Sequence, residues 1–447
     1  MRLILLRKRV LILGAGGRDF HNFNVVFRNN PEYEVVAFAF TQIPGVERRR
    51  YPPELAGAQY PDGIPIIPYK DLGKIIKEYK VDEVVLSFSD ITYDELGKIA
   101  SEVLAAGAEF RLLPPSETYI KSFRPVIAVT AVRTGAGKST VSRAVARELL
   151  RRNIRFVVVR HPMAYGDLSK MRVQIFERVE DMDKWGLTIE EREEYEHYLL
   201  MGIKVLAGVD YGAILREAER MADIILWDGG NNDTPFYTPD YLVTVADAMR
   251  PGQEVSSYPG EINTRLADSV IVNKVSQAPE ENVKKVVNNI KSVNPKAKIT
   301  LADMEVYVEK PELIKGKRVI VIEDSPSVTH GSLPYGAGYV AALKYGAKEI
   351  VDPRPYAVGI IKEMYEKYPH MKEVLPSTGY TEDQLRDLEE TIKRIDADTV
   401  IIGSPADVSR VIRIDKPVIK VKWELKVLEG PTIKDIVDEF LERVGMK

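Results

Sequence analysis

The sequence predicts an α/β protein built from doubly wound parallel sheets. Short apolar runs rich in Val and Ile recur along the chain, and most are followed by a glycine-containing turn and a stretch of helical periodicity. Three of these runs begin at Val10, Val126 and Ala222. Because right-handed crossovers bring the carboxyl ends of parallel strands to one edge, the turns after these runs should gather where α/β proteins bind ligands.

Length and composition limit the classes of protein to consider. A chain of 447 residues predicts two to four domains. A net charge of −3 gives no basic footprint for a nucleic acid, and the lack of cysteines excludes disulfides and thiol catalysis. No apolar run is long enough to span a membrane, so we expect a cytoplasmic protein with neither a membrane nor a nucleic-acid partner. The charged fraction, 29%, resembles a thermophile composition.

We expect three regions along the chain. They are a Rossmann-like domain over residues 1–122, a phosphate-loop nucleotide-binding domain over residues 123–315, and an α/β region over residues 316–447 that packs on the second domain. The alternation of apolar strands and helical stretches predicts this order.

The first region opens with a glycine-rich turn, Gly14 to Asp19, after its first strand. A dinucleotide fingerprint would have glycine where Asp19 stands, and the second strand ends in Thr41-Gln42 rather than in an acid that holds a ribose. An NAD site is therefore disfavoured. An anion site at Gly16, Gly17 and Arg18, or a plain tight turn, remain as interpretations.

The second region opens with the most informative stretch of the chain. The apolar run from Val126 breaks into a glycine-rich turn and resumes as a helix. Glycines let backbone N–H groups surround a phosphate, and the helix N-terminus adds partial positive charge. Lys138 would reach the β- and γ-phosphates, and the Ser139 hydroxyl would bind Mg²⁺. The predicted nucleotide-binding residues of this loop are Gly135, Ala136, Gly137, Lys138, Ser139 and Thr140.

This loop departs from the common phosphate-loop pattern at one position, because Val132 stands where the first glycine belongs. The stretch from Arg133 to Ser139 resembles instead the deviant loop K-G-G-x-G-K-[ST] of the SIMIBI class of P-loop proteins. In that resemblance Arg133 takes the place of the signature lysine.

Two further strand ends carry acids at the same predicted edge. The loop after the strand ending at Arg160 contains Asp167, which would hold Mg²⁺ or its water. The strand from Ala222 delivers Asp228 where a Walker B acid belongs, to hold a Mg²⁺-bound water. The polar residues that follow Asp228 are candidates for substrate binding: Asn231, Asn232 and Asp233. Between the two strands, residues 177–198 are dense in charge, which predicts a solvated helical face.

The next strand ends supply a rim and a base-pocket motif. Arg250 and Arg265 are candidates to face a substrate. Asn273-Lys274 resembles the start of the N-K-x-D motif of GTP-binding proteins, with Ser276 in place of the aspartate that reads guanine. This loss puts guanine specificity in doubt and would leave Asn273 free to contact an adenine. ATP and GTP both remain open.

The third region contains a second candidate anion-binding turn. A buried strand is followed by hydroxyls, a histidine and glycines before the next helix. We expect this turn to hold a phosphate or carboxylate of an acceptor substrate through Ser325, Ser327, Thr329, His330 and Gly331. A helix start with hydroxyl-rich capping is the alternative.

Three stretches together resemble a known family. They are Arg133–Ser139, Trp227–Asp233 and Asp324–Gly331, and they look like archaeal cyclic 2,3-diphosphoglycerate synthetase and its relatives called predicted GTPases. The resemblance covers roughly residues 123–425. It implies a Mg²⁺-dependent synthetase that uses ATP to activate a phosphate of a small phosphorylated acid and to close an intramolecular anhydride. We also expect a homodimer.

In this interpretation Lys138, Arg133, Asp228 and His330 are the catalytic residues. The phosphate loop and the turn at 325–331 must then face one cleft. The alternative function is a GTP-binding switch protein that acts on an unknown partner.

Overall fold

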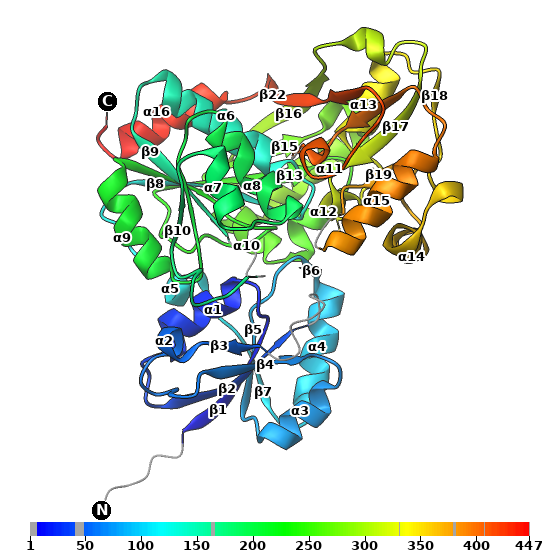
Figure 1. Cartoon of the computed structure of the whole chain (residues 1–447). Coiled ribbons are helices and arrows are strands. Elements are labelled where there is room, and N and C mark those ends of the chain that lie inside the picture. Colours follow the sequence, from blue (N-terminus) through cyan, green and yellow to red (C-terminus); the bar gives the residue numbers. More distant parts are fainter. Residues whose placement is uncertain are drawn as a thin grey trace, which may run out of the picture.

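The computed structural model describes residues 7–40, 49–161, 166–329, 331–378, 381–405 and 407–446. It confirms an α/β fold with parallel sheets (Figure 1). Within these residues no helix is long and apolar enough to cross a membrane. His330, expected to be catalytic and to bind the acceptor, lies outside the described residues.

The N-terminal sheet has the strand order β3-β4-β2-β1-β5-β7. Its strands are β1 (Lys8–Leu13), β2 (Tyr33–Phe40), β3 (Arg50–Tyr51), β4 (Ile64–Pro68), β5 (Glu83–Leu86) and β7 (Glu109–Leu112). All neighbours are parallel except β3 and β4. Its helices are α1 (Arg18–Asn22), continued by a π-helical turn over Phe23–Phe27, α2 (Pro53–Ala56), α3 (Leu72–Tyr79), α4 (Tyr93–Ala105) and α5 (Pro115–Thr118).

The central sheet has nine strands in the order β10-β11-β9-β12-β8-β13-β15-β16-β22. They are β8 (Val126–Ala131), β9 (Phe156–Arg160), β10 (Gln174–Phe176), β11 (Val205–Ala207), β12 (Ile224–Asp228), β13 (Tyr241–Asp247), β15 (Ser269–Asn273), β16 (Lys298–Tyr307) and β22 (Lys422–Glu429). Its helices are α6 (Lys138–Arg151), α7 (Val179–Lys184), α8 (Ile189–Leu199), α9 (Tyr211–Met221), α10 (Gly260–Leu266), α11 (Glu280–Val293) and α16 (Ile433–Arg443). Because β8, β9 and β12 are parallel neighbours, their carboxyl ends meet at one edge.

The third sheet is built around β17 (Arg318–Glu323) and β20 (Thr399–Ile402), which are parallel. Its other strands are β18 (Glu349–Ile350), β19 (Leu375–Pro376) and β21 (Val418–Lys420), and its helices are α12 (Ser325–Val328), α13 (Ala337–Lys344), α14 (Gly359–Lys367) and α15 (Glu382–Arg394). The chain then returns to the central sheet, because β22 pairs antiparallel with β16 and α16 packs on α6. The expected boundaries at residues 122 and 315 stay predictions, but residues 422–443 complete the central unit.

The N-terminal domain is joined to the central unit by a small ladder (Figure 1). Here β6 (Ile91–Thr92) pairs antiparallel with β14 (Ser257–Tyr258). Next to it, the ring of His21 in α1 stacks on Phe236 at a centroid distance of 4.1 Å. The loops at the edge of the N-terminal sheet therefore meet the loops at the edge of the central sheet.

Candidate active site

The phosphate loop follows β8, whose six residues are all buried, and ends at the first residue of α6, Lys138. Gly137 has a φ of +106°, and a Cβ at this position would lie 2.1 Å from Asn273 Nδ2. Only glycine meets both conditions without displacing a neighbour. The loop residues Gly135, Gly137, Lys138, Ser139 and Thr140 line a pocket, whereas Ala136 is packed into the core.

Asp228 lies at the centre of a buried polar network at this edge. Its Oδ1 accepts hydrogen bonds from Lys138 Nζ at 2.6 Å and from Ser142 Oγ at 2.8 Å. Its Oδ2 accepts one from Tyr198 OH at 2.7 Å and forms an ion pair with Arg160. Arg160 is also paired with Glu194 of α8. Asp228 is thus placed beside the phosphate-loop lysine, as the Walker B interpretation requires.

Burial and charge set the protonation of this network. Burial by itself would raise the pKa of Asp228, but the positive charges of Arg160 and Lys138 outweigh it and hold that pKa well below its usual value. Burial lowers the pKa of Lys138 to about 8, although Asp228 opposes the shift. At neutral pH the lysine is charged, and the arrival of a phosphate would provide it with a second counter-charge.

Asn273 and Lys274 donate hydrogen bonds to the backbone of the phosphate loop. Asn273 is fully buried and its Nδ2 donates to the Ala136 carbonyl at 2.9 Å. Lys274 Nζ donates to the Gly135 carbonyl at 2.7 Å and pairs with Asp247 at 2.8 Å. The Asn273 side chain, which was expected to be free to contact a base, is thus fully buried, and its amide nitrogen donates to the loop backbone.

Arg250 connects the two sides of the site. It pairs with Asp247 at 2.8 Å, donates to the Thr134 carbonyl at 2.9 Å and also donates to the Gly331 carbonyl. The predicted rim arginine therefore holds the phosphate loop to the turn at 325–331. Arg265 does not take part, since it is half exposed and pairs with Glu261 of its own helix at 2.6 Å.

The polar residues after Asp228 point in different directions. Asn231 lines the pocket and accepts a hydrogen bond from Thr134 Oγ1 at 3.3 Å. Asn232 is fully buried and donates to the Val132 carbonyl at 2.8 Å, so it supports the loop and does not face a substrate. Asp233 faces the N-terminal domain, where it pairs with Arg18 at 3.3 Å, and it also pairs with His161 at 3.4 Å.

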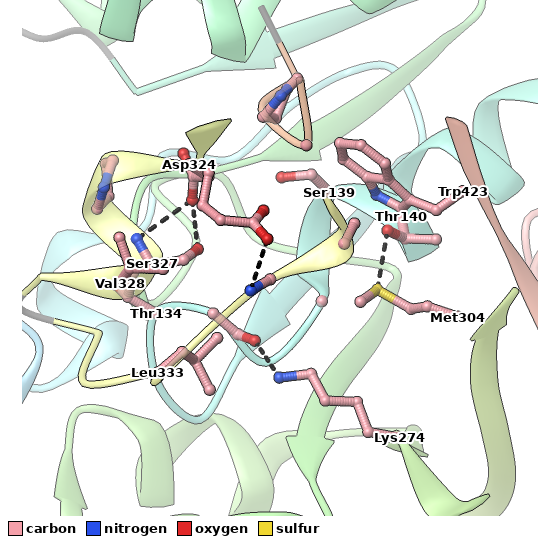
Figure 2. A pocket seen from close by; sticks show the side chains of 18 of the residues that line it. Thr134, Ser139, Thr140, Lys274, Met304, Asp324, Ser327, Val328, Leu333 and Trp423 are labelled. Atoms are coloured by element: carbon pink, nitrogen blue, oxygen red, sulfur yellow. Dashed lines mark hydrogen bonds between the residues drawn. The ribbon is translucent and has the colours of Figure 1, made fainter. Parts of the chain in front are cut away.

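The third sheet provides the opposite wall of the pocket (Figure 2). Asp324 and Ser327 line it, and the carboxylate of Asp324 caps α12 by accepting from Ser327 N at 3.2 Å. Ser325 and Thr329 do not line it, because they bond to each other within the turn and Ser325 N bonds to Ser377. The two loops therefore face one pocket, as phosphoryl transfer requires.

The backbone N–H groups at the end of this second glycine-rich segment bind a carboxylate of the same chain, that of Glu323. The Glu323 carboxylate accepts from the backbone N–H groups of Gly336, Gly338 and Tyr339 at the start of α13, at 2.8–3.2 Å. Burial raises the pKa of Glu323 to about 7 although these bonds lower it. A Cβ on Gly403 would come within 2.4 Å of this carboxylate, so the cradle fits it closely. The expectation that Ser325, Ser327, Thr329, His330 and Gly331 bind an acceptor anion stays a prediction, since His330 lies outside the described residues.

In the glycine-rich turn Gly14–Asp19 the backbone N–H groups also bind a carboxylate of the same chain. The carboxylate of Asp19 accepts from Gly16 N at 2.9 Å and Gly17 N at 3.0 Å, and Arg18 is engaged by Asp233 and Thr234. The tight-turn interpretation therefore holds for Gly14–Asp19. Asp167 does not line the pocket, and its exposed carboxylate lies 3.8 Å from Lys170.

Several residues of the site carried no recognisable signal in the sequence. Glu194 lines the pocket and Tyr198 bonds to Asp228, both from the charged segment that predicted a solvated face. That prediction is wrong for the inner side of α8, where Tyr195 and Tyr198 are also fully buried. Arg133 lines the pocket as expected, but it is paired with Asp90 of the N-terminal domain at 2.9 Å.

Comparisons with known proteins define the relatives of this chain. No protein-family model matches it. It is 56% identical over 434 residues to the arginine synthetase ArcE of Thermococcus kodakarensis, covering 97% of each chain. It is 25% identical over 290 residues to cyclic 2,3-diphosphoglycerate synthetase of Methanothermobacter thermautotrophicus, covering 58% of this chain and 61% of that one.

Among solved structures, LpxK from Aquifex aeolicus in complex with ATP matches 78% of this chain and 96% of its own, at 12% identity and a TM-score of 0.40. That likeness is too distant to support an argument about the site. The family is shown by the sequence relatives, because the match with arginine synthetase ArcE spans nearly the whole of both chains. The chain therefore belongs to the cyclic 2,3-diphosphoglycerate synthetase-like family, as its motifs indicated, and within that family to the group of arginine synthetase ArcE.

Proposed function

We propose that this chain is an ATP- and Mg²⁺-dependent synthetase that makes arginine from citrulline and ammonia. Citrulline is the substrate that chemistry suggests, because its ureido group differs from the guanidinium group of arginine only by oxygen in place of nitrogen. Replacing that oxygen requires its activation as a leaving group, and a γ-phosphoryl group provides one. The name and extent of the 56% identical relative support arginine as the product.

The observation that carries the proposal is the charge of the two pocket walls. The basic side chains among the described lining residues are Arg133, Lys138 and Lys274, all on the side of the phosphate loop. On the wall from the third sheet the acidic side chains are Asp324 and Glu323, of which Glu323 is held by the backbone N–H groups at the start of α13. Glu194 of α8 is a further acidic side chain in the lining. Such a pocket suits an anionic triphosphate on one side and an acceptor with a cationic ammonium group on the other.

The reaction needs positioning and charge neutralisation more than covalent help. The ureido oxygen attacks the γ-phosphorus while the bond to the β-phosphate oxygen breaks and ADP leaves. Ammonia then adds to the ureido carbon. The bond between this carbon and the phosphorylated oxygen breaks, phosphate leaves, and the guanidinium group of arginine is formed. Lys138 would neutralise charge on the phosphates, while Asp228, itself paired with Arg160, holds the lysine in position.

Mg²⁺ would neutralise the developing phosphate charge when it is bound. The Ser139 hydroxyl lines the pocket and would be an oxygen ligand of the ion. The Asp228 carboxylate at the neighbouring strand end is fully buried and bound by Lys138 and Arg160, so it would act on the ion's side of the site through the lysine. The part of the chain that the structure describes contains no cluster of three acidic or histidine side chains. Most ligands of the ion would therefore be phosphate oxygens and water.

Two other functions remain as candidates and are tested alongside. A cyclic 2,3-diphosphoglycerate synthetase would have to place a multiply charged anion against Glu323 and Asp324, which makes it the weaker fit. A GTP-dependent switch is favoured by one contact: the Asp303 carboxylate accepts from Ser276 N at 2.9 Å, beside the position that reads guanine in GTP-binding proteins.

The deciding experiment measures phosphate release and arginine formation by the purified protein in Mg²⁺. ATP and GTP are each tested alone, with citrulline plus ammonium, and with 2,3-diphosphoglycerate. We expect ATP turnover that needs both citrulline and ammonium, with one arginine per phosphate. It should vanish in Lys138→Met and persist in Lys170→Met, which removes an exposed lysine outside the pocket. Turnover that needs only diphosphoglycerate, or slow hydrolysis of GTP alone, would replace the proposal with one of the alternatives.

A further inference from the structure

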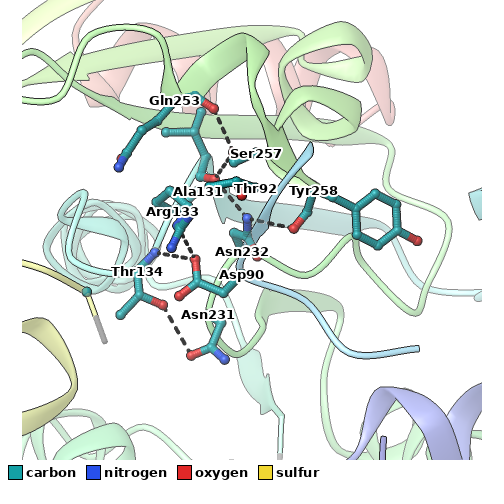
Figure 3. A network of polar contacts seen from close by, with 12 residues as sticks. Asp90, Thr92, Ala131, Arg133, Thr134, Asn231, Asn232, Gln253, Ser257 and Tyr258 are labelled. Carbon is teal, nitrogen blue, oxygen red and sulfur yellow. Dashed lines mark hydrogen bonds and ion pairs between the residues drawn. The ribbon is translucent and has the colours of Figure 1, made fainter. Parts of the chain in front are cut away.

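The N-terminal domain reaches the phosphate loop through the acidic residue Asp90 (Figure 3). Asp90 directly precedes β6, and its backbone N–H donates to the Tyr258 carbonyl at 3.1 Å. The β6–β14 ladder then continues through Ile91 and Thr92. Asp90 is therefore fixed to the central unit by its own main-chain hydrogen bond to Tyr258 and by the adjoining β6–β14 ladder.

The backbone of Asp90 is in the left-handed region, with a φ of +66°. Aspartate tolerates this conformation better than most residues, but it still costs free energy. The side chain is 7% exposed, and its Oδ1 forms an ion pair with Arg133 Nε at 2.9 Å and accepts a hydrogen bond from Thr134 N at 3.1 Å. One carboxylate oxygen thus holds two consecutive residues of the phosphate loop.

We propose that Asp90 is a positioning residue of the phosphate site: it fixes Arg133 and the start of the phosphate loop so that the guanidinium meets the terminal phosphates. The proposal rests on the nucleotide use proposed above. It also assigns a role to the N-terminal domain, because within the described residues the carboxylate that pairs with Arg133 comes from that domain. Asp90 itself does not line the pocket.

The geometry of the ion pair leaves Arg133 able to act. The contact joins Arg133 Nε to the carboxylate, so the pairing does not depend on the two terminal nitrogens of the guanidinium. Arg133 lines the pocket although its side chain is only 14% exposed. A long side chain that is held at Nε loses much of its rotamer freedom before a phosphate arrives, and this preorganisation favours charge neutralisation in the transition state.

Thr134 is held from three sides, which fixes the shape of the loop entrance. Its N–H donates to Asp90, its hydroxyl to Asn231 at 3.3 Å, and its carbonyl accepts from Arg250 at 2.9 Å. These partners come from the N-terminal domain, from the loop after β12 and from the loop after β13. Loss of Asp90 would therefore release the N-terminal side of this arrangement and leave the other two in place.

The control is a hydrogen bond that joins the same two domains away from the phosphate loop. Tyr93, three residues further on, donates from its hydroxyl to Glu261 at 2.7 Å across the two domains. Neither residue lines the pocket. Tyr93→Phe removes an interdomain hydrogen bond, from a residue more exposed than Asp90, without touching the phosphate loop.

The test is a double-mutant cycle on the full-length protein, with Asp90→Asn, Arg133→Gln, the double variant and Tyr93→Phe. The readouts are kcat, KM for citrulline, and the affinity for a non-hydrolysable ATP analogue measured by calorimetry. We expect Asp90→Asn and Arg133→Gln each to lower kcat by about 10–100-fold with little change in KM for citrulline. The double variant should fall within about twofold of Arg133→Gln, because both changes remove the same interaction. Tyr93→Phe should stay within about twofold of the wild type.

Two outcomes would overturn the inference. One is a kcat of Asp90→Asn no lower than that of Tyr93→Phe, and the other is a double variant whose loss equals the product of the two single losses. If the wild type makes no arginine, the cycle is scored on affinity for the ATP analogue, where the same coupling is expected. A wild type that binds the analogue but shows no coupling refutes the role of Asp90 alone, whereas one that binds no nucleotide refutes the proposed function as well.

Discussion

Asp228→Asn is the most informative single change, because it keeps the size of the side chain and removes the charge at the centre of the site. Lys138 and Arg160 are both buried and would lose their shared counter-charge. Leaving a buried charge without its partner typically costs about 3–5 kcal/mol. Arg160 keeps Glu194, so we take the lower end, about 3 kcal/mol. At about 2–4 °C per kcal/mol for a domain of this size, the Tm should fall by about 6–12 °C.

The same change should reduce ATP turnover by at least about 100-fold, since Lys138 loses the carboxylate that positions it. Glu83→Gln is the matched control. Glu83 is a buried carboxylate of the N-terminal sheet that pairs with two cations, Lys8 at 2.7 Å and Arg111 at 3.3 Å, away from the pocket. It should lower the Tm and leave turnover within about twofold of the wild type. The reasoning is refuted if Asp228→Asn lowers the Tm by less than about 2 °C, or lowers turnover no more than the control.

Two further predictions concern the phosphate loop. Asn273→Ala removes the hydrogen bond to the Ala136 carbonyl and should weaken ATP binding about tenfold, since a buried hydrogen bond is worth about 1–1.5 kcal/mol; unchanged affinity in calorimetry would show that the loop holds its shape without this support. ATP affinity should also fall as the pH rises through about 8, because the pKa of Lys138 is lowered to that value and its charged form is the one that attracts phosphate. The loss should approach tenfold for each further pH unit, whereas Lys138→Arg stays charged and should give a flat profile; parallel profiles would contradict the lowered pKa.

The sequence was sufficient to predict the elements whose position follows from the strands of a parallel sheet. Asp228 ends one buried apolar strand and Lys138 follows the glycine-rich loop after its neighbour, and parallel strands that are neighbours bring such residues to one edge. It was not sufficient to predict partners from other regions. Asp90 lies in a short polar turn of another domain, and Glu194 in a segment whose charge density is typical of a solvated helix. Such side chains are turned inward by tertiary packing, which local patterns do not encode.

The function of a glycine-rich turn depends on which group supplies the negative charge. Three turns of this chain suggested anion sites: Gly14–Asp19, the phosphate loop, and the segment that leads into α13. In the first the amides bind Asp19, and at α13 they bind Glu323, so backbone N–H groups at a helix start attract a carboxylate that the chain itself carries. In the phosphate loop the acid at the neighbouring strand end, Asp228, binds Lys138 and not the loop amides, while Asp90 binds the amide of Thr134 at the start of the loop. A turn of this kind therefore predicts a negative charge, and it predicts a ligand only where a lysine takes up the nearest carboxylate.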